Sequence, residues 1–181
     1  MRDPANMPGT VLAGRYLLDV LRSEATLANA GAMQFDATDL SSTNLVSVRI
    51  APLSRLVDPL LGSTTSSDAF DAFQAQCELA ESLSHPCIET IYDHGDATLD
   101  GERYVFTVAE RLAGGSLREF LDRGRRLTPS QALIVGIDVC RALDAAAKQG
   151  IVHGDIRPSR LVFGLDRRVR LVGFEIGRAH V

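Results

Sequence analysis

Residues 150–174 place the tightest limit on what this chain can fold into. The segment begins with a glycine, continues as the polar loop IVHGDIRPS, and then contains two short apolar runs, RLVF and VRLVGF, joined by GLDRR. A glycine is common just beyond the end of a helix, and short β-branched runs around a turn favour a β-hairpin. The segment therefore predicts a helix that ends near Gly150, an irregular loop, and a two-stranded ribbon.

The first 110 residues contain mainly strand signals. Apolar and β-branched runs bounded by turn residues predict strands within 15–50 and over 88–96 and 103–110. Asp100 and Gly101 lie between the last two runs, and this pair favours the tight bend of a hairpin. Apolar residues recur every three or four positions over 68–83, which predicts one helix, with Ser67 or Asp68 as its cap.

Two capping boxes predict the starts of helices in the C-terminal half. They are S-x-x-E at 116–119 and T-x-x-Q at 128–131, in which each side chain satisfies a backbone amide at the other end of the motif. Pro129 at the first helical position favours the second helix, and its wide apolar band predicts a buried central helix. The order of elements predicts an α+β fold with a β-rich lobe followed by a helical lobe.

Composition and charge argue against several classes of function. The net charge of −4 gives no general surface for nucleic acid or an anionic membrane. No apolar run approaches the roughly 20 residues of a spanning helix, and the first ten residues lack the apolar core of a secretion signal. Cys77, Cys87 and Cys140 are far apart, so we expect reduced packing residues in a cytoplasmic protein, with no metal site.

Four segments carry motifs in a shared order and spacing. They are LAGRYLL, LSHPCIETIYDHGD, VAERLAGGSLREFL and, most clearly, ALDAAAKQGIVHGDIRPSRLVF. The last resembles A-L-x-x-A-H-x-x-G-I-V-H-R-D-L-K-P-x-N-I-L of the bacterial Ser/Thr protein kinases, of the kind common in actinobacteria. The resemblance implies a protein-kinase-like fold: a leader at 1–11, a β-rich N-lobe with its hinge at 12–112, and the first half of the C-lobe at 113–181. Because the chain ends at Val181, soon after the D-F-G position, we expect a truncated or fragmentary C-lobe whose helix over 129–149 is partly uncovered.

The resemblance also assigns catalytic roles, and several are altered. In the family an Asp orients the acceptor hydroxyl, a Lys contacts the transferred phosphate, and an Asn and the D-F-G Asp hold Mg²⁺. Asp155 and Arg157 take the first two positions, and His153 is kept as a structural residue. Arg160 and Gly173 take the metal-binding positions, and neither side chain can ligate a cation. The sequence thus predicts no metal site, and Asp155 is either a catalytic survivor or a loop residue that bonds nearby amides.

The phosphate-binding lysine and its partner are altered as well. LVSVRIA is similar to the V-A-x-K strand, which places Arg49 at the Lys position and Gln76 at the position of its Glu partner. Arg is larger and planar, so the exchange is not neutral at a tight site. The resemblance implies an Arg49–Gln76 hydrogen bond at best. The alternative is that Arg49 is a solvated strand residue that pairs with a neighbouring acid, such as Glu78 or Glu81.

The remaining nucleotide contacts are only partly kept. The first glycine of the expected phosphate loop, Gly31, is out of register, so we expect that loop to be lost. By resemblance, the backbone groups of Glu110 and Leu112 in the hinge would still hold adenine. Phe174 of the D-F-G motif is kept as a core residue, and Glu175 replaces the motif's Gly.

The pattern favours a catalytically impaired pseudokinase that acts in Ser/Thr-kinase signalling through protein contacts. Its expected partner is a phosphothreonine-reading domain or an active kinase, with Thr64 and Thr65 as candidate phosphorylation sites. We expect no cofactor, and any bound ATP would be held without Mg²⁺. Two alternatives stay open: an active atypical Ser/Thr kinase, and a nucleotide-binding regulator without phosphoryl transfer.

Overall fold

The computed structural model describes residues 6–23, 32–57 and 65–174. The chain divides into two compact units. Unit 1 comprises Met1–Cys77 and Ile91–Arg111, and unit 2 comprises Glu78–Thr90 and Leu112–Val181. Strands dominate unit 1, and helices with a short ribbon make up unit 2, which confirms the predicted α+β fold.

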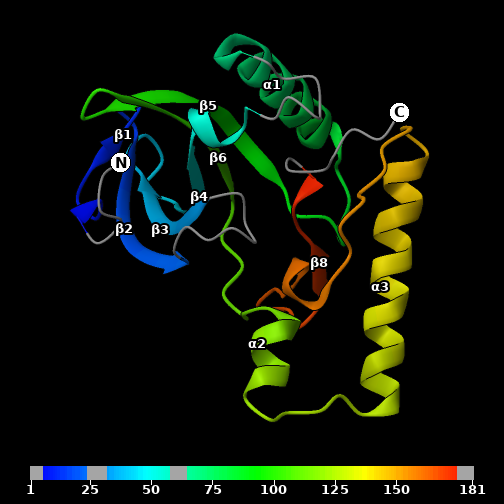
Figure 1. The fold of residues 1–181 in the computed structure, drawn as a ribbon. Helices are drawn as coiled ribbons and strands as arrows, with labels where there is room; N and C mark the ends of the chain where they lie inside the picture. The colour runs from blue at the N-terminus through cyan, green and yellow to red at the C-terminus, as the bar shows by residue number, and fades with distance from the viewer. Residues whose placement is uncertain (1–5, 24–31, 58–64, 175–181) are drawn as a thin grey trace. The chain divides into compact units, whose positions relative to one another are not determined.

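Six antiparallel strands form the sheet of unit 1, which curls strongly in Figure 1. Their bounds are β1 Val11–Leu12, β2 Tyr16–Ser23, β3 Met33–Asp39, β4 Leu45–Pro52, β5 Ile91–Leu99 and β6 Glu102–Glu110. The spatial order is β1-β2-β3-β4-β6-β5. The predicted bend between β5 and β6 is confirmed, since Asp100 and Gly101 have φ values of 50° and 80°, as a type I′ turn requires.

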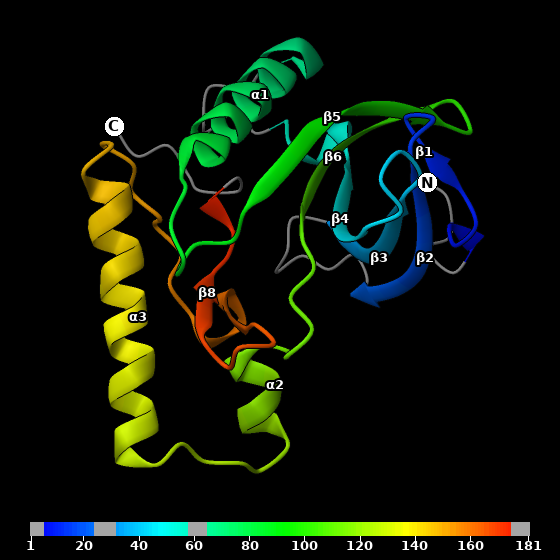
Figure 2. The same cartoon turned by 180° about the vertical axis from the view of Figure 1, so that it is seen from behind.

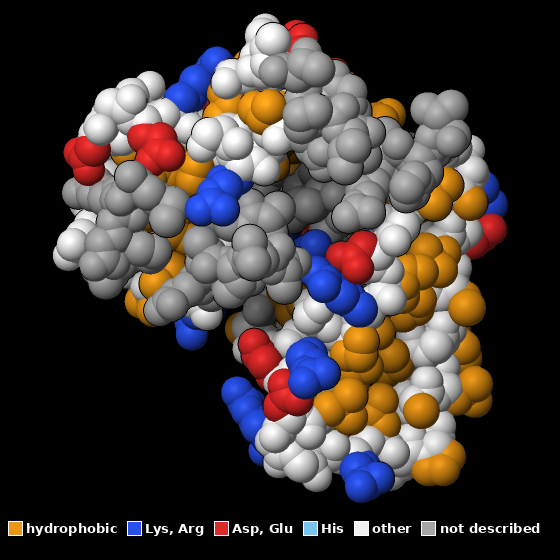
Figure 3. Space-filling view, in the orientation of Figure 1, with side chains coloured by type: hydrophobic (Ala, Val, Ile, Leu, Met, Phe, Trp, Pro, Cys, Tyr) orange, Lys and Arg blue, Asp and Glu red, His pale blue; other side chains and the backbone are white. Residues whose placement is uncertain are grey.

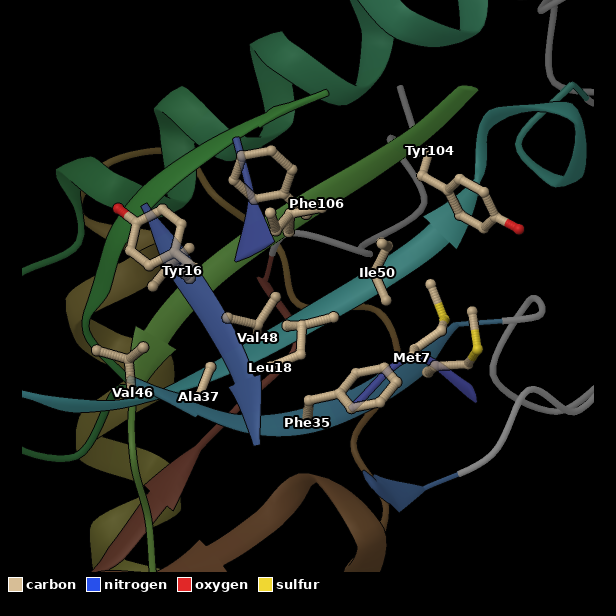
Figure 4. Close-up of a cluster of buried hydrophobic side chains, with 13 residues drawn as sticks. Met7, Tyr16, Leu18, Phe35, Ala37, Val46, Val48, Ile50, Tyr104 and Phe106 are labelled. Carbon is tan, nitrogen blue, oxygen red and sulfur yellow. The ribbon is translucent and has the colours of Figure 1, made fainter. Parts of the chain in front are cut away.

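One face of this sheet encloses an apolar core, drawn in Figure 4. Alternate residues of the strands point into it, because successive side chains of a strand lie on opposite faces. Val46, Val48 and Ile50 of β4 are core members, and β3 and β6 contribute in the same alternation. Met7, which the sequence assigns to the leader, is fully buried in this core.

The helix α1, Ser66–Ser82, covers part of the opposite face of the sheet. Within unit 1, Phe70 and Phe73 pack against a small cluster that includes Ala51 of β4. The ring of Phe73 meets that of His94 edge-on, with centroids 6.2 Å apart. The apolar spacing that predicts this helix therefore corresponds to its buried side.

The cap of α1 differs from the prediction. The hydroxyl of Thr65 accepts a hydrogen bond from the Asp68 amide at 3.1 Å, and the Asp68 carboxylate accepts one from the Thr65 amide at 3.0 Å. Thr65 is therefore the cap, in place of Ser67 or Asp68, because its reciprocal bond with Asp68 satisfies two amides at once.

Unit 2 contains the helices α2 and α3 and the two-stranded ribbon, seen from behind in Figure 2. The elements are α2 Leu117–Asp122, α3 Pro129–Ala147, the 3₁₀ turn η5 Pro158–Arg160, β7 Leu161–Phe163 and β8 Val169–Leu171. Both predicted capping boxes are confirmed, at Ser116 and at Thr128. The segment around Cys87 extends the ribbon, because Leu171 donates to the Cys87 carbonyl and accepts from the Glu89 amide.

The prediction that α3 is a buried central helix is wrong for the described residues. Leu133, Ile134 and Ile137 are 66%, 51% and 41% exposed, and apolar side chains gather along this helix in Figure 3. The helix buries only a narrow side, at Asp138, Ala142 and Ala146. This exposure agrees with the other expectation, that the helix over 129–149 is partly uncovered.

The same exposure corrects one cysteine assignment. Cys77 and Cys87 are buried as predicted, whereas Cys140 lies on the uncovered side of α3 and is exposed. Burial, together with the nearby Asp138 carboxylate, raises the pKa of the Cys87 thiol. Within the described ranges, no helix is both long and apolar enough to cross a membrane.

Candidate active site

The β7–β8 ribbon brings the two predicted metal-binding positions together. Leu161 pairs with Leu171 in the ribbon, and the Val172 amide donates to the Arg160 carbonyl at 2.9 Å. Residues 160 and 173 are thirteen positions apart in the sequence, yet the pairing sets them side by side. This is the arrangement in which an Asn and an Asp would share a cation.

The Arg160 side chain fills the space beside Gly173. A Cβ atom built on Gly173 would lie 2.8 Å from an Arg160 terminal nitrogen, 2.9 Å from Cζ and 3.1 Å from Cδ. Gly173 has a φ of 99°, which glycine adopts without strain. The guanidinium, only 13% exposed, thus lies where the first atoms of a side chain at position 173 would start.

Asp155 is held by two arginines. Its Oδ2 atom accepts from Arg160 Nε at 3.2 Å and forms an ion pair with an Arg157 terminal nitrogen, also at 3.2 Å. Asp155 and Arg157 are 46% and 40% exposed, so the pair with Arg157 is well solvated. One charged cluster is therefore formed by Asp155, Arg157 and Arg160. The family resemblance places these residues at three positions with separate catalytic roles.

A buried histidine fixes the loop that carries Asp155. The Asp155 amide donates to His153 Nδ1 at 3.2 Å, so Nε2 carries the proton and donates to the Val172 carbonyl at 3.1 Å. The ring packs edge-on against Phe174, with centroids 4.7 Å apart. His153 therefore ties the Asp155 loop to the segment that contains Gly173.

These side chains do not fit a divalent cation. Mg²⁺ takes oxygen ligands in near-octahedral geometry, and the position between residues 160 and 173 holds a guanidinium instead of two oxygens. Among the described residues, no group of three or more His, Cys, Asp and Glu is arranged to hold a metal ion. Asp155 is the one carboxylate of the cluster, and its charge is already engaged by arginine.

Comparison with known proteins agrees with the motifs. The family model described as protein tyrosine and serine/threonine kinase matches residues 60–180. The chain belongs to the protein kinase family. The predicted kinase-like fold is thereby confirmed.

Its relatives are bacterial Ser/Thr protein kinases. A probable serine/threonine-protein kinase of Streptomyces coelicolor is 31% identical over 169 residues, which is 93% of this chain and 23% of that protein. Probable kinase PknB of Corynebacterium glutamicum is 30% identical over 170 residues, covering 93% and 24%. PknB of Mycobacterium tuberculosis is 31% identical over 107 residues, covering 59% and 17%. The chain thus spans about a quarter or less of the length of these relatives.

Within this kinase domain, the predicted nucleotide contacts in unit 1 lie on identified elements. Arg49 lies on β4, is 9% exposed, and pairs in register with Gln34 and Thr107. It shares a face with Ala51, which packs toward α1. Gln76 lies on α1 and is half-buried. An Arg49–Gln76 bond stays a prediction.

The hinge residues follow directly. Glu110 ends β6, where it pairs with Val46, and Leu112 is the second residue after it. Both are half-buried, and their adenine contacts stay predictions. Gly31, Thr64 and Glu175 lie outside the described residues.

The carboxylate of Asp138 in unit 2 carries a buried charge that the sequence motifs do not predict. Asp138, 1% exposed on α3, accepts two hydrogen bonds from the Arg168 guanidinium, one of them at 2.9 Å from Nε. It also accepts from the Val169 amide at 3.4 Å, and the Cys87 thiol lies at 3.7 Å. The Arg168 hydrogen bonds hold the pKa of Asp138 below its usual range. An acid on the apolar side of a predicted helix is the signal that would have revealed it.

Proposed function

We propose that this kinase domain is catalytically impaired and acts in Ser/Thr-kinase signalling through contacts with other proteins. The observation that carries the proposal is the Arg160 guanidinium, which packs against Gly173 and pairs with Asp155. Metal ions neutralise the charge that develops on a transferring phosphoryl group, and they contribute several kcal/mol of transition-state stabilisation. A domain without that contribution retains the fold and loses most of the rate.

The charge around Asp155 supports the same proposal. A catalytic Asp orients the substrate hydroxyl and accepts its proton. Here the carboxylate is shared between Arg157 and Arg160 on the same oxygen. Asp155 in this setting holds the loop together.

A signalling role through protein contacts has its own support. The matched relatives are named as Ser/Thr protein kinases, and apolar side chains are exposed along α3. Thr65 is exposed at the start of α1, where a phosphate would be favoured by the helix amides. We propose a phosphothreonine-reading domain or an active kinase as the partner, and a cytoplasmic location in keeping with three free cysteines.

Phosphoryl transfer from γ-labelled ATP tests the impaired activity. The chain is incubated with Mg²⁺ or Mn²⁺ and a generic protein acceptor, beside the matched variant Asp155→Asn. We expect equal labelling of the two proteins, at the level of a blank. Labelling of the wild type that Asp155→Asn abolishes would show an active atypical kinase and overturn the proposal.

The partner is tested by phosphorylating the chain with an active Ser/Thr kinase and measuring its affinity for a forkhead-associated domain. We expect binding that depends on phosphorylation and is weakened by Thr65→Ala. Equal binding of the phosphorylated and untreated chains would contradict a phosphothreonine-reading partner.

A further inference from the structure

The Arg160 guanidinium lies against residue 173, the position at which the family pattern has a metal-binding Asp. In the family pattern, the four positions 155, 157, 160 and 173 hold Asp, Lys, Asn and Asp, which together carry two negative charges and one positive charge. In this chain they hold Asp, Arg, Arg and Gly, with one negative and two positive charges. The exchange at 160 adds one positive charge and the exchange at 173 removes one negative charge. Together they raise the net charge by two, the charge of one divalent cation.

The geometry places this added charge at a defined point. The guanidinium lies 2.8–2.9 Å from where a Cβ at Gly173 would be, so it fills space beside the first atom of any side chain at position 173. Its Nε is fixed by Asp155 at 3.2 Å, and only 13% of the side chain is exposed. Among the described residues, Asp155 is the one acceptor of this guanidinium. The terminal amino groups thus keep donors for another ligand.

Two arginines on one side of a loop favour an anionic, oxygen-rich ligand. A guanidinium offers planar pairs of N–H donors that match phosphoryl oxygens, and it keeps its charge at any physiological pH. Arg157 and Arg160 share one carboxylate oxygen, so the cluster keeps a net positive charge. Bound Mg²⁺ would be repelled by this cluster, whereas an uncomplexed phosphoryl chain would be attracted.

We propose that Arg160 takes the place of the divalent cation, so that unit 2 binds the phosphoryl chain of a nucleotide without metal. The proposal rests on the impaired activity proposed above and deepens it, since it turns the lost metal site into an anion site. Arg160 is the principal ligand, Arg157 adds a second cation, and Gly173 provides the room that the guanidinium needs. No bond is made or broken in the ligand.

The test is a calorimetric titration of the full 181-residue chain with ATP, once with excess EDTA and once with excess Mg²⁺. Tripolyphosphate and adenosine are titrated in parallel to separate phosphoryl binding from base binding. We expect saturable binding of ATP and tripolyphosphate in EDTA, and weaker binding when Mg²⁺ complexes the phosphates. Arg160→Asn should weaken ATP binding in EDTA by about tenfold or more, as expected for the loss of a charge-assisted hydrogen bond.

Two further variants separate charge from folding. Arg160→Lys keeps the charge and should restore most of the affinity that Arg160→Asn loses. Arg118→Gln removes an exposed arginine of α2 that pairs with Asp122, and it should change nothing. Equal thermal midpoints for the variants establish that each is folded.

Three results would overturn the inference: no binding of ATP or tripolyphosphate in EDTA, binding that requires Mg²⁺, or binding that Arg160→Asn leaves unchanged. None of these by itself contradicts a domain that acts through protein contacts. Conversely, Asp155-dependent labelling in the transfer assay would overturn the proposed function even if metal-free binding were found. The two failures are thus distinguishable.

Discussion

Asp138→Asn should destabilise unit 2 strongly, because it removes a buried carboxylate charge of α3 that pairs with Arg168. The carboxylate is 1% exposed and accepts two bonds from Arg168 and one, at 3.4 Å, from the Val169 amide. A hydrogen bond to a charged group contributes about 1.5–3 kcal/mol. Arg168 is 45% exposed, so water replaces part of what the guanidinium loses. We therefore expect a loss of about 2–3 kcal/mol in the free energy of unfolding.

The two units can be followed separately in one urea titration. The chain has no tryptophan, and its tyrosines, Tyr16, Tyr92 and Tyr104, all lie in unit 1. Tyrosine fluorescence therefore reports unit 1, whereas circular dichroism at the helix band reports α2 and α3 of unit 2 together with α1, most of which belongs to unit 1. We expect Asp138→Asn to lower the midpoint seen by circular dichroism much more than the fluorescence midpoint.

The matched control is Asp144→Asn, which removes an exposed acid of the same helix that pairs with Lys148. Exposed pairs of this kind contribute less than about 0.5 kcal/mol. If Asp138→Asn and Asp144→Asn shift the unfolding transition equally, Asp138 is not a structural charge and the reasoning is refuted.

Two further predictions concern pH and glycine. Because the folded pKa of Asp138 lies below the unfolded value of about 3.9, its stabilisation is complete above about pH 5 and is lost as the pH falls below about 4. The stability gap between wild type and Asp138→Asn should therefore narrow in acid urea titrations, and a constant gap would contradict this. Gly114→Ala should cost about 1–3 kcal/mol, since the new Cβ would lie 2.5 Å from the Phe163 carbonyl oxygen. A Cβ at Gly136 of α3 would meet no atom within 4 Å, so Gly136→Ala should instead stabilise the helix by about 0.5–1 kcal/mol. Thermal unfolding measures both changes, and a raised midpoint for Gly114→Ala or a lowered one for Gly136→Ala would contradict these predictions.

Local signals in the sequence predict much of this fold because their physics is short-range. The capping boxes at 116–119 and 128–131 and the Asp100-Gly101 bend each depend on residues within three positions, and all are confirmed. For the cap of α1, the same local signals predict Ser67 or Asp68, whereas the structure has Thr65. Thr65 and Asp68 form a reciprocal pair that competes with Ser67 for the same amides.

The sequence leads to two opposite predictions for α3, a buried helix and a partly uncovered one, because burial depends on what packs against the helix. The apolar band is present in the sequence, but whether Leu133 or Cys140 is covered depends on distant segments. The apolar band by itself therefore does not decide whether the helix is buried.

The candidate site could be predicted in part. The sequence identifies Arg160 and Gly173 separately as lost metal ligands by their similarity to a motif. It does not show that the guanidinium fills the space of the missing carboxylate, because positions 160 and 173 meet only through β7–β8 pairing. Nor does it show that Arg157 and Arg160 share one oxygen of Asp155.

The central claim is that a guanidinium, and no divalent cation, occupies the space between Asp155 and residue 173. Crystals of the chain grown with ATP and excess Mn²⁺ test it directly, because Mn²⁺ is located by its anomalous scattering. We expect no manganese at the Asp155 carboxylate, and we expect the Arg160 side chain to lie against Gly173. A manganese ion bound to Asp155, with Arg160 turned away from Gly173, would contradict it.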